Sequence, residues 1–481
     1  MEFRDILKNL PEVKGPVEKK LSFNTKLKWT LIVLVSYFIM ENIALYGLEN
    51  NALARFEYLA IIMGTNFGSI ISLGIGPIVM ASIILQLLVG SKILDIDTSD
   101  PEGKKFFQGL QKLLVFFFII FEATIYVVMK GLQAAPGYNG MLIFQLILGG
   151  LAILFMDELC NKWGFGSGIS LFIAAGVGYR LFVASFGFLG TEGGVCLLNF
   201  GSVSCPGKVL SFIQALMLAD SKGAMLALAA LVSTVILFLV VVWAQSLKIE
   251  IPLSYDRLRG YSMKWPLQFF YASVIPVILT AALIANLQLF GGLVYNAATP
   301  CISTESQVAC TMGPKIASYF TFLGEFQNGR PISGLLYWIS PTSILDRIIQ
   351  GSWEWMLIAQ AISHIIFYMF FSALFSVFWV KTSGMDAMNQ AQNILNSGLQ
   401  IPGFRKDKRI LESILARYVM PLTVMGGMAI GLLAALADIL GALVAGTALL
   451  LGIMITFQFY QNIAQQHALD MNPALKKMMG V

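Results

Sequence analysis

The chain has 481 residues, of which 57% are hydrophobic and 12% are charged. Soluble proteins carry about 25% charged residues, so this composition excludes an ordinary soluble protein and indicates a polytopic, all-α membrane protein. The net charge of +5 does not suggest a nucleic-acid-binding protein. The opening stretch MEFRDILKNLPEVKGPVEKKLSF is charged throughout and has no apolar core, so we expect no signal peptide there.

Hydropathy predicts ten membrane spans. Their expected limits are residues 28–47, 74–91, 107–130, 139–159, 168–188, 225–246, 271–291, 355–380, 419–437 and 438–461. An even number of spans places both termini on one side of the membrane, and most of the lysines and arginines fall in segments on that side. Because basic segments stay in the cytoplasm, we expect both termini to be cytoplasmic.

The spans divide into two groups of five, which is typical of inverted-repeat membrane proteins with a pathway between the halves. The expected divisions are a cytoplasmic segment 1–27, a first half 28–188, an external loop 189–224, a second half 225–461 with cytoplasmic loops 247–270 and 381–418 and an external loop 292–354, and a cytoplasmic tail 462–481.

The segment 56–90 is nearly uncharged but too long for one ordinary span. Five residues that favour turns interrupt it: Gly64, Gly68, Gly74, Gly76 and Pro77. A broken helix is tolerated at membrane depth only where protein or a cavity surrounds it, so we expect this segment at the centre of the molecule. The pattern predicts a short helix over 55–63, a turn, and a second helix over 75–89 with the proline in its first turn.

Aliphatic residues open three of the predicted spans. Ile75 and Val79 lie four positions apart on one face of the second span, Ile169 and Ile173 open the fifth, and Ile278 opens the seventh. Such side chains could line a dry pore that excludes ions without any fixed charge. On spacing alone, ordinary helix packing is the favoured interpretation.

The five cysteines sort by predicted side of the membrane. Cys196 and Cys205 share one external loop, Cys301 and Cys310 share another, and Cys160 lies alone near the cytoplasmic face. Pairs outside and a single thiol inside predict two local disulfides. The alternative is free thiols in the external loops. A CxxC spacing is absent, so we expect no zinc site.

Basic residues gather in two predicted cytoplasmic loops. Arg257 and Arg259 lie in the first, and Arg405 and Lys406 lie in the second. Charge alone favours the positive-inside rule as their explanation. The alternative is docking of an anionic partner such as ribosomal RNA phosphate.

The sequence offers no catalytic constellation, nucleotide motif or cofactor site. The two histidines, His364 and His467, have no acid or nucleophile pattern nearby. The stretch GFGSG lacks the Lys-Ser/Thr of a P-loop and does not follow a strand. Any energy source would therefore come from a partner or a gradient.

The ionisable residues inside the predicted spans include Glu41, Glu122, Arg180 and Asp438. We expect Glu41 and Asp438 near span ends, and Glu122 and Arg180 paired or at a protein–protein surface. An inverted-repeat secondary transporter of a small solute is an alternative function, although it would be expected to carry more polar groups at the membrane midplane.

Four stretches resemble the SecY family, the large subunit of the protein-conducting translocation channel, in its archaeal form: LGIGPIVMASIILQLLVGSKIL, KWGFGSGISLFIAAG, IEIPLSYDRLRG and PVILTAALIAN. The resemblance runs from LPEVKGPV near the start to GTALLLGI in the last span. It implies ten transmembrane helices in two pseudo-symmetric five-helix halves around an hourglass pore. It also implies a channel rather than an enzyme, with no cofactor.

The resemblance implies roles for individual residues. The pore ring would comprise Ile75, Val79, Ile169, Ile173, Ile278 and Leu451. The plug that seals the external funnel would comprise Phe56, Glu57, Tyr58, Leu59, Ala60, Ile61, Ile62, Met63, Gly64, Thr65 and Asn66. The second and third spans would face the seventh and eighth as a lateral gate tuned by Gln86, Thr124 and Asn286. The ribosome would dock on Arg257, Arg259, Arg405 and Lys406.

The implied function is to move unfolded secretory polypeptides across the membrane and to release signal sequences and membrane anchors sideways into lipid. The implied partners are a SecE-type (gamma) subunit, a Sec-beta-type small subunit, and a ribosome with its nascent chain. The implied location is a prokaryotic plasma membrane. Met80, beside Val79, is a departure from the family pattern that bears on the seal. An insertase that works only laterally is a second alternative, although a ring and a plug would serve no purpose there.

Overall fold

A computed structural model gives the fold of the chain. It describes residues 10–17, 21–51, 65–90, 93–94, 96, 101–129, 131–188, 196, 205–255, 262–272, 275–302, 321–327, 330–396, 399–400 and 408–471.

Ten helices of 15 residues or more form the body of the described structure. They are α2 (Phe23–Glu41), α4 (Gly76–Gly90), α5 (Pro101–Val128), α6 (Asn139–Trp163), α7 (Gly168–Phe186), α9 (Ser221–Gln245), α10 (Ile275–Ile302), α14 (Trp355–Thr382), α16 (Lys408–Ile439) and α17 (Gly446–Met471). Each of the ten expected spans overlaps one of these helices, which confirms the predicted all-α, ten-helix membrane fold.

Shorter elements lie between the long helices. The helices are α8 (Lys208–Met217), η2 (Thr321–Leu323), α12 (Leu335–Ile339), α13 (Ile344–Gln350) and α15 (Ala387–Asn396). The strands are β1 (Leu48–Asn51), β2 (Leu132–Ala134), β3 (Lys248–Tyr255), β4 (Ser262–Gln268), β5 (Phe326–Gln327), β6 (Arg330–Pro331) and β7 (Leu399–Gln400).

Eight of the long helices are long and apolar enough to cross a membrane, and α4 is apolar but shorter. They differ in how much protein surrounds them. In α10, 78% of the most apolar window is buried inside the protein, whereas in α9 the share is 28% although α9 is the more hydrophobic helix. Exposed apolar residues such as Val235, Leu239 and Trp243 cover α9, so α9 faces lipid and α10 runs through the interior.

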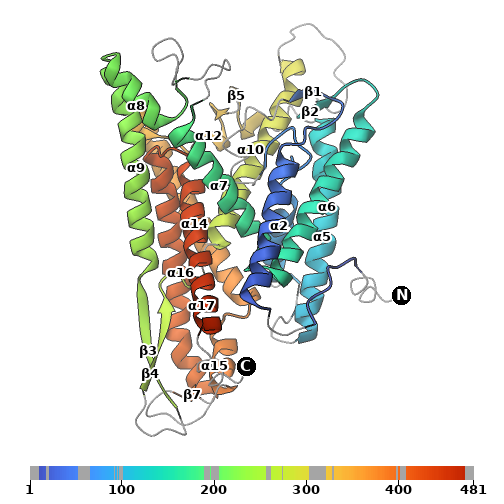
Figure 1. Cartoon of the computed structure of the whole chain (residues 1–481), viewed down its shortest axis with the longest axis vertical. Helices are drawn as coiled ribbons and strands as arrows, with labels where there is room; N and C mark the ends of the chain where they lie inside the picture. The colour runs from blue at the N-terminus through green and yellow to red at the C-terminus, as the bar shows by residue number, and fades with distance from the viewer. Residues whose placement is uncertain are drawn as a thin grey trace.

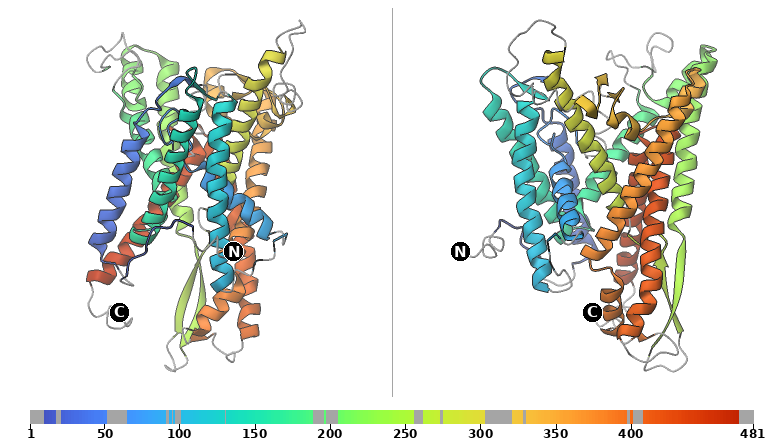
Figure 2. Two further views of the ribbon diagram at one scale, coloured as in Figure 1. Left: turned by 90° about the vertical axis from the view of Figure 1, so that its right-hand side faces the viewer. Right: turned by 180° about the vertical axis from the view of Figure 1, so that it is seen from behind.

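The helices form two groups that meet along α10. Seen from behind, α2, α5 and α6 lie on one side of the bundle and α9, α14 and α16 on the other, with α10 leaning between them (Figure 2). Helix α4 packs against both α10 and α14, and α7 packs against α17. The two groups are therefore in contact at two separate places.

Small residues bring α14 and α16 close together. A Cβ atom added to Gly427 would lie 2.8 Å from the Ser376 Cβ and 3.0 Å from the Ala373 Cα, so a larger residue would push the helices apart. The Ser376 hydroxyl donates a hydrogen bond to the Thr423 carbonyl at 2.7 Å. Close backbone approach and interhelical hydrogen bonds of this kind hold membrane helices together without a hydrophobic driving force.

A three-stranded sheet projects from one end of the bundle, which we call the hairpin end (Figure 1). Strand β3 lies in the middle and pairs antiparallel with β4 and with β7, in the order β4-β3-β7. Its buried side chains join those of α15 and α16 in a second apolar core, as Ile251, Leu267, Ala391, Leu411 and Leu415 show. This core explains why α16 begins at Lys408 rather than at the expected residue 419.

Residues 10–17 lie across the hairpin end of α6, and we call this segment the N-terminal clasp. The Val13 N–H donates to Glu158 Oε2 at 3.0 Å, and the Trp163 indole N–H donates to the Lys14 carbonyl at 2.9 Å. Lys162 pairs with Glu12. These bonds fix an extended segment that has no secondary structure of its own.

Helix α2 begins and ends earlier than the expected limits 28–47. Ser22 caps it by accepting a hydrogen bond from the Thr25 N–H, so the helix starts at Phe23. After Glu41 the chain becomes extended and pairs with the segment that precedes α4. The Leu45 N–H donates to the Gly68 carbonyl, and the Ile70 N–H donates to the Ile43 carbonyl, both at 2.9 Å. Hydropathy cannot detect such a pairing. Helix α10 likewise runs to Ile302, beyond the expected limit 291.

Candidate functional site

The six residues of the expected ring lie at the starts of four long helices. Ile75 directly precedes α4 and its carbonyl accepts the Val79 N–H at 3.0 Å, so one helical turn carries both side chains. The other four lie near the start of α7 (Ile169, Ile173), of α10 (Ile278) and of α17 (Leu451). Helix α10 contacts α4 and α17, and α17 contacts α7. The four helix starts are thus joined by direct packing.

These side chains belong to one apolar cluster. Ile75, Val79, Ile173, Ile278 and Leu451 are each at most 6% exposed and are part of the same core, and the half-buried Ile169 packs against that core. A closely packed aliphatic cluster has no polar partners to hold a water molecule or an ion. The arrangement can therefore keep a constriction dry when it is closed.

The link before α4 is buried at the centre of the bundle, as expected for a helix broken at membrane depth. Positive φ angles of +101° at Gly68 and +54° at Gly74 turn the chain there, a conformation that glycine adopts without steric cost. Ile71 and Leu73 in this link are fully buried. The Arg180 guanidinium on α7 donates to the Thr65 carbonyl at 3.3 Å, which ties the link to α7.

One expectation for the ionisable residues was wrong. Glu122 is fully buried on α5, and neither carboxyl oxygen has a hydrogen-bond partner within the described structure, so it does not pair with Arg180. Asp438 lies next to the end of α16, as expected for a residue near a span end, and it is 7% exposed. It contacts His364 Nε2 at 3.3 Å. The acid near His364 lies 74 residues away in the sequence, where no local pattern could reveal it. Glu41 does end its helix, yet it too is buried.

The polar residues of the expected lateral gate lie on α4, α5 and α10, and α4 packs against α5, α10 and α14. Gln86 on α4 and Asn286 on α10 are buried, whereas Thr124 on α5 is half-buried. Asn286 donates to the Ala282 carbonyl and Thr124 to the Ile120 carbonyl, each within its own helix and at 2.8 Å. The Gln86 side-chain oxygen has no partner in the described structure. The structure therefore shows no hydrogen bond that would fasten these three residues together.

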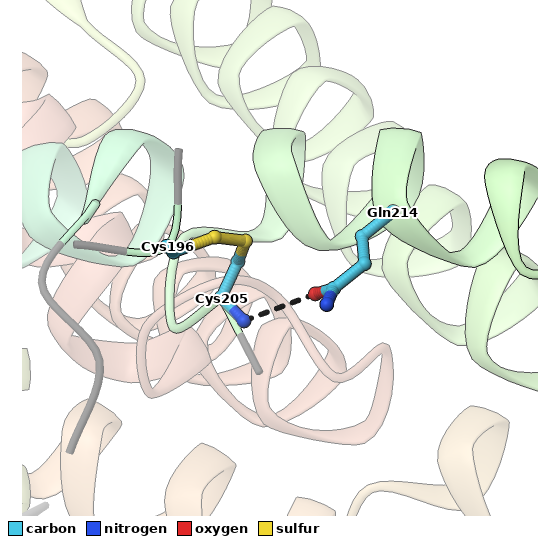
Figure 3. The surroundings of a disulfide bond; sticks show 3 residues. All are labelled: Cys196, Cys205 and Gln214. Atoms are coloured by element: carbon cyan, nitrogen blue, oxygen red, sulfur yellow. Dashed lines mark hydrogen bonds between the residues drawn. A yellow bond between two sulfur atoms is a disulfide. The ribbon is translucent and has the colours of Figure 1, made fainter. Parts of the chain in front are cut away.

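A disulfide joins Cys196 and Cys205 in the connection between α7 and α8 (Figure 3). The Cys205 N–H donates to the Gln214 side-chain oxygen on α8 at 3.1 Å. The chain crosses itself beside this bond, where the Gly207 N–H donates to the Gly187 carbonyl at 3.0 Å. The disulfide thus closes a turn that already holds the ends of two helices together. Cys160 is free and buried.

Several sequence predictions lie outside the described residues. These are plug residues 56–64, the basic residues Arg257, Arg259, Arg405 and Lys406, and the second cysteine pair, for which the Cys301 side chain and all of Cys310 are not described. Of the expected plug, the structure describes Thr65 and Asn66.

The chain is similar to known proteins in both sequence and structure. The SecY family model matches residues 69–460. A protein translocase subunit SecY from Methanothermobacter thermautotrophicus is 39% identical over 486 aligned residues, covering 100% of this chain and 98% of the relative. A solved SecY structure has a TM-score of 0.79 at 35% identity and 99% coverage of both chains. In that protein, a plug domain stabilises the closed state of the translocation channel. Sec61 in the canine ribosome–channel complex from the endoplasmic reticulum has a TM-score of 0.76 at 34% identity and the same coverage.

Proposed function

The chain belongs to the SecY family, and on that basis we propose that it is the channel-forming subunit of a protein translocase. It moves unfolded polypeptides across the membrane and releases signal sequences and membrane anchors sideways into lipid. The observation that carries this function is the buried aliphatic cluster at the starts of α4, α7, α10 and α17. The comparisons favour a channel over the alternative of a small-solute transporter.

An aliphatic constriction suits a substrate whose side chains vary at every step. A polypeptide in transit offers no fixed hydrogen-bond pattern, so a ring of charges would trap some segments and repel others. Isoleucine, valine and leucine side chains instead adapt to the passing chain and close again by exclusion of water. The buried faces of Ile75, Val79, Ile173, Ile278 and Leu451 support this role.

The lateral exit is proposed between α4 and the pair α10 and α14. This contact joins the two groups of helices. Gln86 and Asn286 are buried there, and leaving polar groups partly unsatisfied makes the closed contact less stable than an apolar one of the same area. The lower stability of the closed contact supports a gate that opens for a sufficiently apolar segment.

The plug is proposed to be residues 56–66, the segment that leads into the buried link. Support comes from the tie between Arg180 and Thr65 at its end and from the plug domain of the solved SecY relative. The two pseudo-symmetric halves, 28–188 and 225–461, are proposed on the same footing, since α4 and α7 meet the second group of helices at two separate places.

The proposed partners are inferred from basic residues of the sequence and from the known relatives. Arg257 and Arg259 lie in the sequence between β3 and β4, and Arg405 and Lys406 lie between β7 and α16. We assign them to ribosome docking because the canine Sec61 relative is part of a ribosome–channel complex. A SecE-type subunit and a Sec-beta-type subunit complete the proposed assembly. The protein is a multi-pass integral membrane protein, and we place it in a prokaryotic plasma membrane with both termini in the cytoplasm.

Site-specific photo-crosslinking tests the channel function. A crosslinking residue is placed at Ile75 and, separately, at Ile278, and a stalled nascent chain with a signal sequence is presented. Crosslinks from both positions are expected, because the chain must pass the constriction. If neither position crosslinks while a control at Arg405 does, chains dock without threading, and a laterally working insertase replaces this proposal.

A further inference from the structure

Two ring-bearing helices start against buried aspartates that belong to the preceding helix. The first N–H groups of any helix lack partners inside it. At α7, Asp157 Oδ1 on α6 accepts the Ile169 N–H at 3.0 Å. At α17, Asp438 Oδ1 on α16 accepts the Thr447 N–H at 2.6 Å. Both aspartates are at least 91% buried, since their exposed fractions are 9% and 7%.

The usual capping position does not supply this bond in α7. Ser167 precedes the helix, but its side chain makes no hydrogen bond to the backbone N–H groups of α7. Its hydroxyl instead contacts Asp157 Oδ1 at 3.4 Å. A carboxylate from a neighbouring helix does what a local N-cap residue normally does, so the start of α7 is fastened to α6 rather than to its own loop.

Glycines at the two helix starts let each start approach the helix that carries the aspartate. A Cβ atom added to Gly168 would lie 2.6 Å from the Asp157 Cα. A Cβ atom added to Gly446 would collide with the backbone of Ala437 and lie next to Asp438. In both places the helix start rests directly on the backbone of the aspartate-bearing helix. The two groups of helices thus share one device, a buried aspartate with a facing glycine.

The anchored residues are in register with the constriction. Ile169 is itself a predicted ring residue, and Ile173 follows it by four positions. Leu451 follows Thr447 by four positions, which places it one turn later on the same face. A shift of one residue along a helix turns a side chain by about 100°, which would remove it from the ring. The anchors therefore define both the rotation and the depth of these side chains.

The Asp438 carboxylate is itself held in place. The Thr447 hydroxyl and His364 Nε2 both contact Asp438 Oδ2. The other ring nitrogen, His364 Nδ1, lies 2.7 Å from the Ile339 carbonyl. Because a carbonyl can only accept, Nδ1 carries a proton and donates it there. The contact of 3.3 Å between Nε2 and Asp438 Oδ2 then fixes the orientation of the carboxyl group.

We infer that Asp157 and Asp438 are positioning residues of the channel: they hold the starts of α7 and α17 so that Ile169, Ile173 and Leu451 return to the closed ring after each polypeptide has passed. This inference rests on the proposed function. It predicts that loss of an anchor loosens the seal while the ring side chains themselves remain unchanged.

The test measures ion leak through the purified, reconstituted translocase together with its thermal stability. Asp157→Ala and Asp438→Ala are expected to increase the leak about fivefold, the factor that loss of a typical helix cap represents. Asp157→Asn and Asp438→Asn retain a side-chain oxygen for the N–H group and should restore the seal. Ser376→Ala is the matched control, because it removes a buried interhelical hydrogen bond that touches neither α7 nor α17.

The outcomes separate positioning from mere stability. Leak in the alanine variants, with tight asparagine and Ser376→Ala channels, supports the inference. Folded alanine variants that stay tight, or a Ser376→Ala leak of equal size, overturn it. If the alanine variants do not fold, Gly168→Ala decides: a leaky channel supports the inference and a tight one overturns it. Ile278→Gly keeps the two proposals apart, because its failure to leak would instead reject the ring.

Discussion

Removing the disulfide between Cys196 and Cys205 measures how much the covalent bond adds to a turn that hydrogen bonds already hold. The cysteines are nine positions apart. Closing a loop of that length restricts the unfolded chain by about 2.6 kcal/mol at 25 °C in the chain-entropy treatment. The Cys205 N–H can still reach Gln214 in a serine variant, so this entropic part is the whole of the expected loss.

The assay compares the free energy of unfolding in mixed micelles for the wild type and for the Cys196→Ser/Cys205→Ser double variant, with and without reductant. The wild type should lose about 2 to 3 kcal/mol on reduction, and the double variant should start from that lower value. An effect of reductant that persists in the double variant would indicate a second disulfide, for which Cys301 and Cys310 are the predicted pair. A difference below about 0.5 kcal/mol between wild type and double variant would refute the reasoning, because chain entropy alone exceeds it.

Three further predictions concern other parts of the fold. His364→Ala should lower the free energy of unfolding by about 1–3 kcal/mol, because the buried Asp438 loses one of its hydrogen-bond partners; a loss no larger than that of a surface substitution would contradict this. Gly149→Ala should cost about 1–3 kcal/mol by overpacking against a backbone carbonyl of the link before α4, whereas Gly140→Ala on the same helix meets nothing within 4 Å and should be neutral in thermal unfolding. The lysine bound to Glu12 holds the pKa of that carboxyl below its usual 4.5, so the N-terminal clasp should be most stable above pH 4.5 and loosen as the pH falls further, as hydrogen exchange of residues 10–17 would report.

Hydropathy predicted the ten long helices because lipid imposes one simple requirement, a long apolar segment with all backbone groups satisfied. The broken segment before α4 was also predictable, since glycines and a proline interrupt an uncharged stretch. Helix ends were less accessible. The start of α16 at Lys408 depends on an apolar core with β3 and α15 that forms outside the membrane region, and hydropathy does not detect such a core.

For the ring and the two anchoring aspartates, the sequence again predicted only a part of the arrangement. Ile75 and Val79 are spaced so that one helix face is evident from the sequence, yet their joining with Leu451 in one cluster depends on tertiary packing. The contact of His364 with Asp438 spans 74 residues, and the hydrogen bond from the Ile169 N–H to Asp157 spans the turn between two helices. Polar contacts between distant segments leave no periodic signal in the sequence.

The β4-β3-β7 sheet has a mechanical consequence. Seven paired positions from Lys248 to Ser254 make the hairpin a stiff arm of roughly 20 Å. Strand β7 pairs with the far end of this arm at Ser254 and Tyr255, and the buried side chains of the sheet pack in one core with those of α15 and α16. A load applied to the sheet would therefore reach α16 as a torque rather than as a chemical signal.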